Sequence, residues 1–197
     1  TVEVPQRKKE AILFSKDEFI KPNTSLEVLS NLRPAFKKET GSVTAGNSSG
    51  LNDGAAATII ASEDAVKKYN LKPLARIVSS AVVGVEPRIM GIGPVEASNK
   101  ALLKAGLSLK DMDIIELNEA FAAQALACTR ALGLKDNDAR LNPNGGAIAL
   151  GHPLGVTGAR ITYSAALELK EKNKKYALIT MCIGVGQGYA AVIENIK

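Results

Sequence analysis

Short apolar runs alternate with amphipathic segments over most of the chain. Runs rich in aliphatic and β-branched residues predict five strands, over residues 54–61, 75–83, 113–117, 176–182 and 188–194. Apolar residues at helical spacing predict helices over residues 25–31, 62–69, 94–105, 119–132 and 159–172. Strands that alternate with helices and then end in two consecutive strands indicate parallel βαβ units plus an antiparallel terminal hairpin. We therefore expect a layered α/β fold, with a mixed five-stranded sheet and helices on both faces.

The first 22 residues do not fit this alternation. Val2, Val4 and the run 11–14 have the pattern of strands, but a polar segment follows them directly without a hydrophobic partner. A domain rarely begins in this way. We expect residues 1–22 to be the remnant of a preceding loop region with a linker, and residues 23–197 to form one domain.

The composition is that of an ordinary globular protein. Hydrophobic residues make up 46% and charged residues 23% of the chain, and no apolar run approaches the length of a membrane-spanning helix. Neither end carries a signal-peptide or lipidation pattern. The two cysteines have neither metal-ligand nor disulfide spacing. We therefore predict a cytoplasmic protein with no metal site and no membrane segment.

The net charge of +5 favours an anionic ligand. Nucleic acid is not expected as a partner, because the basic residues form no stripe with interleaved aromatic side chains. The basic runs at residues 7–9 and 172–175 have the pattern of solvated surface. A small molecule that carries several phosphates fits the charge better.

A glycine-rich stretch, residues 142–160, contains the only histidine of the chain, His152. So many glycines indicate that the local backbone shape, or room for a neighbour, matters more here than local stability. Because a helix is predicted directly after this stretch, the imidazole lies in or just before its first turn, where the helix dipole favours the neutral form. A neutral imidazole can accept a proton. His152 is therefore a candidate general base, and the alternative is a structural histidine beside a turn.

Asn118 and Cys182 each stand at the end of a predicted strand. Ligands of α/β sheets bind outside the carboxyl ends of the strands, so we expect these two side chains to meet His152. Asn118 either orients a water or polarises a carbonyl, or else caps the following helix. Glycines 184, 186 and 188 follow Cys182, and since the next element is a strand, we interpret them as a turn whose N–H groups can form an oxyanion hole. Cys128 has the helical spacing of a packing residue.

A serine hydrolase is a second interpretation of the same sequence. Residues 46–50 match the pattern Gly-X-Ser-X-Gly around Ser48. Asp111 or Asp113, followed by His152, gives the chain order of a hydrolase triad. The nucleophile elbow needs a strong strand before the serine and a helix after it. Here a predicted strand follows instead, which argues against this interpretation.

Three motifs resemble, in order and spacing, the C-terminal active-site blocks of thiolases, the acetyl-CoA C-acetyltransferases and 3-ketoacyl-CoA thiolases. They are Asn118-Glu-Ala-Phe121, Gly151-His-Pro-Leu-Gly155 and Cys182-Ile-Gly184. Residues 43–56 and 90–94 are similar to further thiolase segments, so the resemblance covers essentially the whole chain. It implies a thiolase-like C-terminal domain and an acyltransferase of fatty acid metabolism. Coenzyme A or acetyl-CoA would be a substrate, and no cofactor would be bound permanently.

The resemblance also implies roles for single residues. His152 would deprotonate the thiol nucleophile, and Cys182 would remove or return the α-proton of the second acyl group. Asn118 would hold a water that forms one oxyanion hole with His152, and the N–H of Gly184 would contribute to the other. The residues that match positions along the pantetheine arm of coenzyme A and its cleft are Ser49, Ala45, Phe36, Ala120 and Phe121.

The sequence departs from the thiolase pattern in length and in one catalytic residue. Thiolases have two similarly folded halves, and their covalent nucleophile is a cysteine of the N-terminal half. Neither Cys128 nor Cys182 matches that motif, and Val185 stands where thiolases commonly have a glycine. The resemblance therefore implies a C-terminal half that is inactive alone, needs an N-terminal half and forms homo-oligomers through exposed apolar surface. The alternative is a non-catalytic subunit that binds acyl-CoA or serves as a scaffold.

Overall fold

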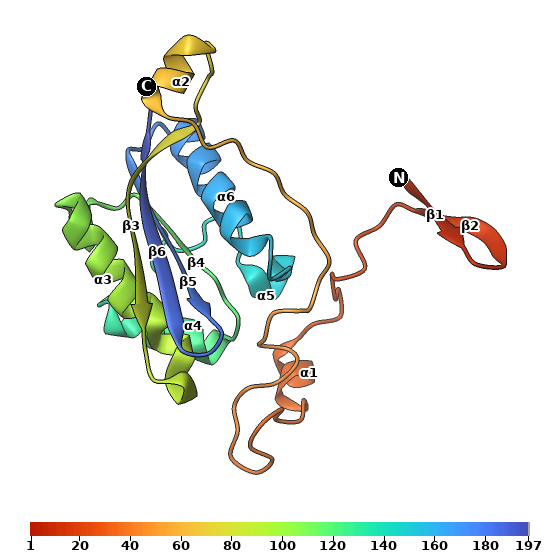
Figure 1. Cartoon of the computed structure of the whole chain (residues 1–197). Helices are drawn as coiled ribbons and strands as arrows, with labels where there is room; N and C mark the ends of the chain where they lie inside the picture. The colour runs from red at the N-terminus through yellow and green to blue at the C-terminus, as the bar shows by residue number, and fades with distance from the viewer. Residues whose placement is uncertain (197) are drawn as a thin grey trace.

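The computed structural model describes residues 1–196 and contains a mixed sheet of four strands in the order β3-β6-β5-β4 (Figure 1). The strands are β3 (Ala75–Gly84), β4 (Ile114–Leu117), β5 (Tyr176–Ile183) and β6 (Gln187–Asn195). β4 and β5 run parallel, whereas β6 is antiparallel to both β5 and β3. The predicted parallel unit and the terminal hairpin are therefore confirmed.

Helices cover both faces of this sheet, as predicted. They are α3 (Gly93–Ala105) and α4 (Ala122–Ala131) on one face and α6 (Thr157–Glu171) on the other. Side chains alternate along a strand, so Leu178 and Val192 join the core under α3, while Ile179 and Ile193 join the core under α6. Both cores are built mainly of aliphatic side chains, as a chain without tryptophan requires.

The predicted strand over residues 54–61 is wrong, and the sheet therefore has four strands instead of five. This segment is an extended connection that leads to α2 (Glu63–Lys68) (Figure 1). Ile59 and Ile60 are 86% and 76% exposed. The apolar composition suits a buried strand, but a strand also needs a neighbour with free backbone groups. None of the strands in residues 1–196 pairs with this segment.

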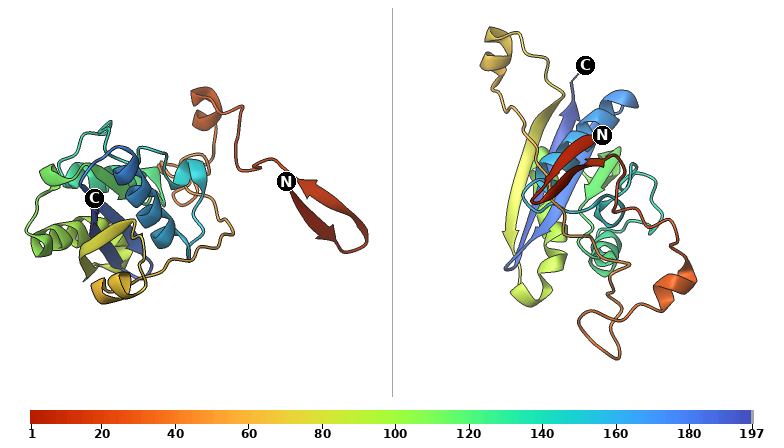
Figure 2. Two further views of the ribbon diagram at one scale, coloured as in Figure 1. Left: turned by 90° about the horizontal axis from the view of Figure 1, so that it is seen from above. Right: turned by 90° about the vertical axis from the view of Figure 1, so that its right-hand side faces the viewer.

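Residues 1–60 lie largely outside the four-stranded sheet and the helices that pack on it. They contain a hairpin of β1 (Val2–Gln6) and β2 (Lys9–Phe14) and the short helix α1 (Leu26–Ser30). Figure 2 shows the hairpin projecting away from the main sheet. Large apolar side chains are exposed along this segment, among them Leu13, Leu26 and Leu51. The expected exposed apolar surface is therefore present, whereas self-association through it stays a prediction.

Three short helical turns connect the main elements. They are η1 (Pro87–Ile92), η2 (Leu109–Asp111) and α5 (Ala147–Leu150). η1 leads directly into α3, whose first residue, Gly93, lies against β6. A Cβ added at Gly188 of β6 would clash with the backbone of Gly93. Because Gly188 pairs with Cys182 across the hairpin, this close approach helps to fix the end of β5.

Candidate active site

The carboxyl ends of the parallel strands β4 and β5 bring two predicted site residues to one edge of the sheet. Leu117 pairs with Thr180, and the backbone N–H of Asn118 donates to the Thr180 carbonyl at 3.0 Å. Cys182 lies two residues beyond Thr180 on the neighbouring strand. Continued by one residue, this register places Asn118 opposite Met181, one residue before Cys182, on a strand about 5 Å away.

The side chain of Asn118 faces His152 and does not cap a helix. Asn118 is 1% exposed, and its Nδ2 lies 3.4 Å from Nε2 of His152. The capping alternative is wrong, because α4 begins at Ala122 with Phe121 as its N-cap. Oδ1 of Asn118 is buried and has no hydrogen-bond partner within residues 1–196. A buried acceptor of this kind is costly to leave unsatisfied and suits a bound water.

Asn142 and Glu119 hold the end of β4 in place. Asn142 accepts from the N–H of Leu117 at 2.9 Å, and its Nδ2 donates to the Leu117 carbonyl at 3.0 Å and to Glu119 at 2.8 Å. The second carboxylate oxygen of Glu119 accepts from the N–H of Ile148 in α5 at 3.2 Å. Because Glu119 is tied to this loop, the following helix starts at Ala122 and not at residue 119 as predicted.

His152 lies in the loop between α5 and α6, before the first residue of α6. Its backbone N–H donates to Oδ1 of Asn52 at 3.1 Å. The preceding Gly151 has φ 100, and a Cβ there would press against Asn52. Glycine is therefore needed at this position for both conformation and space, which explains one of the glycines around His152.

Both ring nitrogens of His152 have a polar neighbour. Nδ1 lies 2.6 Å from Oγ1 of Thr157, and Nε2 faces Asn118. Burial lowers the pKa of His152, and the positive charge of Arg160 lowers it further. The neutral imidazole expected from the sequence is therefore supported by burial first and by the charge of Arg160 second.

Cys182 is 7% exposed and lies where β5 turns back into β6. Burial raises the pKa of its thiol, which is therefore protonated near neutral pH and available as an acid. Gly184 opens the turn. Val185 and Gly186 follow with φ 59 and φ 88, so a β-branched residue occupies the left-handed region. A strand follows, as the interpretation of this glycine run as a turn requires.

Cys128 is a packing residue, as predicted. It is 0% exposed and packs with Leu117 and Ala125. Its thiol donates to the Gly91 carbonyl at 3.2 Å. Burial raises the pKa of Cys128 to about 11, so the reactive thiolate is not populated near neutral pH.

The residues matched to the coenzyme A arm lie on the loop before residue 50 and at the start of α4. The backbone N–H and the hydroxyl of Ser49 both donate to the Ala120 carbonyl, at 3.0 and 3.2 Å. The rings of Phe36 and Phe121 meet edge to face, with centroids 5.9 Å apart. Ala45 is exposed on the same loop as Ser49. The fold therefore joins two pairs of these residues that are far apart in sequence.

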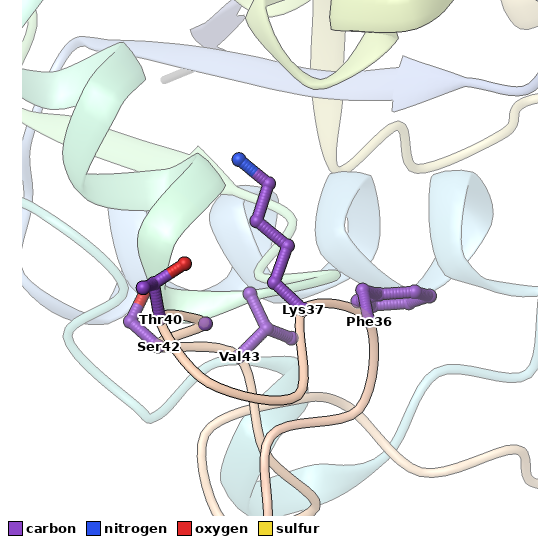
Figure 3. A pocket seen from close by; sticks show the side chains of 6 residues that line it. Phe36, Lys37, Thr40, Ser42 and Val43 are labelled. Carbon is purple, nitrogen blue, oxygen red and sulfur yellow. The ribbon is translucent and has the colours of Figure 1, made fainter.

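An open cavity of about 290 Å³ adjoins this contact (Figure 3). Its walls include the ring of Phe36, the side chain of Val43 and the backbone around Gly41. Lys37 also lines it, and in Figure 3 its amino group extends away from the loop. An apolar wall beside a cation suits a ligand that has both an uncharged arm and anionic groups.

The hydrolase triad is not assembled. Ser48 donates its hydroxyl hydrogen to the Thr44 carbonyl at 2.7 Å. The carboxylates of Asp111 and Asp113 accept from backbone N–H groups near them in the fold. Nδ1 of His152 faces a threonine and not an aspartate. The serine hydrolase interpretation is therefore wrong.

No cluster of three or more His, Cys, Asp or Glu side chains in residues 1–196 is arranged to hold a metal ion. Among the helices of the same residues, none is both long and apolar enough to cross a membrane.

Asn52, Asn142 and Thr157 contact the site but were not singled out from the sequence. Asn142 opens the glycine-rich stretch and has φ 43, a conformation that asparagine tolerates better than most residues. An asparagine at the start of such a stretch could therefore have been predicted as a turn residue. Thr157 opens the helix after His152. The bond between Asn52 and His152 joins residues far apart in the chain, and no local pattern reveals it.

The sequence and this fold have known counterparts. Residues 71–195 match the family model of the thiolase C-terminal domain, and residues 1–64 match that of the thiolase N-terminal domain. The chain belongs to the thiolase family. The resemblance is thereby confirmed, and with it the acyltransferase class of the family. The division into residues 1–22 and 23–197 stays a prediction.

Individual thiolases are similar over nearly the whole chain. The beta-ketoadipyl-CoA thiolase of Acinetobacter baylyi is 59% identical over 195 residues, which cover 99% of this chain and 48% of that protein. The 3-oxoadipyl-CoA/3-oxo-5,6-dehydrosuberyl-CoA thiolase of Escherichia coli is 58% identical over 180 residues, or 91% of this chain and 45% of that protein. Human mitochondrial 3-ketoacyl-CoA thiolase in complex with CoA has a TM-score of 0.88 at 58% identity, over 93% of this chain and 46% of that one. The chain spans about half the length of the curated relatives it matches.

Proposed function

We propose that this chain supplies the acid–base and oxyanion groups of a thiolase active site that forms or cleaves 3-ketoacyl-CoA. The contact between Asn118 and Nε2 of His152, at the edge of the sheet where β5 carries Cys182, supports this proposal. Claisen chemistry on a thioester needs a base, a second proton carrier and donors for an oxyanion. In this proposal, His152, Cys182 and the groups around them fill these three roles.

In the cleavage direction, a cysteine outside residues 1–197 gives its thiol proton to Nε2 of His152 and attacks the C3 carbonyl. The C2–C3 bond breaks, and Cys182 gives its proton to C2, which releases acetyl-CoA. The thiol of coenzyme A then gives its proton to the Cys182 thiolate and takes the acyl group. The released cysteine recovers its proton from His152, so all groups return to their starting states.

The polar groups around these residues have matching roles in the proposal. The unpaired Oδ1 of Asn118 holds a water, and this water and His152 stabilise one oxyanion. The N–H of Gly184 contributes to the second oxyanion hole. The pantetheine arm of coenzyme A lies along Phe36, Ala45, Ser49, Ala120 and Phe121, where two of the contacts described above already bring the loop to α4.

The nucleophile belongs, in this proposal, to an N-terminal half that pairs with this chain, and the paired unit forms homo-oligomers. The exposed apolar side chains of residues 1–60 support such a partner. Both cysteines of the chain are free, which is consistent with the reducing cytoplasm that we propose as its location.

A chimera tests the function. This chain replaces the aligned half of the beta-ketoadipyl-CoA thiolase of Acinetobacter baylyi, and cleavage of acetoacetyl-CoA and of 3-oxoadipyl-CoA by coenzyme A is measured beside the parent enzyme. We expect turnover of at least one substrate, and a loss of at least about 100-fold in His152→Ala and in Cys182→Ala. Thr162→Val, in the second turn of α6, where the hydroxyl donates to the Gly158 carbonyl, is the control and should keep normal turnover.

A folded chimera without turnover, next to an active parent, refutes the proposal. If that chimera still binds acyl-CoA with an affinity that His152→Ala and Cys182→Ala leave unchanged, the chain is a non-catalytic binding subunit.

A further inference from the structure

Thr157 is the first residue of α6 and is completely buried. Its Oγ1 lies 2.6 Å from Nδ1 of His152 and 3.1 Å from the Pro153 carbonyl oxygen. The same carbonyl accepts the backbone N–H of Thr157 at 3.0 Å. The first turn of α6 therefore holds the hydroxyl against the imidazole and leaves it little freedom to rotate away.

The hydrogen bonds on the two sides of the ring favour one tautomer. The Thr157 hydroxyl has one hydrogen, and when it donates this hydrogen to the Pro153 carbonyl at 3.1 Å, Oγ1 is left to accept from a protonated Nδ1. At the other nitrogen, Nδ2 of Asn118 is a donor and lies 3.4 Å from Nε2. If Thr157 instead donated to Nδ1, the proton on Nε2 would face the N–H groups of Asn118. Two donors would then oppose each other in a buried site.

We propose that Thr157 is a positioning residue that fixes His152 in the Nδ1–H tautomer and so keeps the lone pair of Nε2 free to accept a proton. The assignment of the tautomer stands on the contacts of the imidazole alone. The use of this lone pair as the base of thiolase chemistry rests on the proposed function. The burial that lowers the pKa of His152 acts in the same direction, because it keeps the ring neutral.

The first test reads the tautomer without any catalysis. The chain contains a single histidine, so a long-range nitrogen–proton NMR correlation of ¹⁵N-histidine-labelled protein at pH 8 reports on His152 alone. We expect a protonated Nδ1 and an unprotonated Nε2 in the wild type. Thr157→Val should shift the population to Nε2–H, and Thr157→Ser should restore the wild-type pattern.

The matched control is Thr162→Val, which removes a hydroxyl of the same helix that donates to the Gly158 carbonyl at 2.7 Å in the same geometry. It should leave the signals of His152 unchanged. A wild-type ring protonated at Nε2 overturns the proposal whether or not any variant folds. A folded Thr157→Val variant that keeps Nδ1–H also overturns it.

The second test uses the chimera described above. Thr157→Val should lower kcat at least about 10-fold, with the KM for coenzyme A within about threefold of wild type, and Thr157→Ser should regain most of the loss. An unchanged kcat in Thr157→Val refutes the positioning role. An inactive wild-type chimera refutes the proposed function instead, while the NMR result for the tautomer still stands or falls by itself.

Discussion

Glu116 is a buried acid next to the site, and its replacement by glutamine should stabilise the protein at neutral pH. It lies on β4, is 2% exposed, and its Oε1 has no hydrogen-bond partner within residues 1–196. Burial raises the pKa of Glu116 from 4.5 to about 7, while Arg160 pulls it down and Glu119 and Glu168 push it up. The folded protein therefore binds more protons than the unfolded chain between these two values, so stability falls as pH rises through this window.

At about 1.4 kcal/mol per pKa unit, the rise in the pKa of Glu116 from 4.5 to about 7 corresponds to about 3 kcal/mol of destabilisation. This loss of stability develops between the two pKa values and is complete above pH 7. Glu116→Gln cannot ionise and keeps the size of the side chain. Its free energy of unfolding should match that of the wild type near pH 4.5 and exceed it by about 3 kcal/mol at pH 8.

Urea unfolding followed by circular dichroism from pH 4.5 to 8 measures both curves. The control is Glu96→Gln at an exposed position of α3, which should change the free energy of unfolding by less than about 0.5 kcal/mol. The same pH dependence in wild type and Glu116→Gln, or a variant that is the less stable protein at pH 8, would show that Glu116 does not ionise at this cost.

Substitutions at three further positions test the backbone around the site by the same unfolding assay. Val185→Gly should raise the free energy of unfolding by about 0.5–1 kcal/mol, because it relieves a left-handed β-branched residue that is 83% exposed; a loss would contradict the strain. Gly188→Ala should lower it by about 3 kcal/mol, since the methyl group meets the backbone of Gly93, and a neutral effect would mean that α3 can move away. Asn142→Ala should cost about 2–4 kcal/mol through its lost bonds to Leu117 and its positive φ, whereas Asn142→Gly, which keeps the backbone conformation, should cost less.

The sequence predicted the strands that form the edge of the sheet better than the loop contacts that hold His152 at this edge. Parallel strands that end at Leu117 and Ile183 follow from apolar runs separated by helices, and this alone places Asn118 near Cys182. The segment 54–61 was mistaken for a strand because apolar composition does not tell whether a pairing neighbour exists.

The contacts of His152 depend on loops whose conformation has no periodic signal. The bond between Asn52 and His152 joins residues 100 positions apart in the chain, and the bond from Thr157 depends on how the glycine-rich loop bends back onto α6. The late start of α4 has a similar cause, because a tertiary bond of Glu119 outweighs local helix propensity.

We propose that this chain carries the proton-transfer groups of a thiolase while the covalent nucleophile lies outside it. Peptide mapping by mass spectrometry of the chimera, after incubation with acetyl-CoA, tests this directly. We expect one acetyl group on a cysteine of the Acinetobacter baylyi half and unmodified Cys128 and Cys182. An acetyl group on either of these two cysteines would contradict the proposed division of roles.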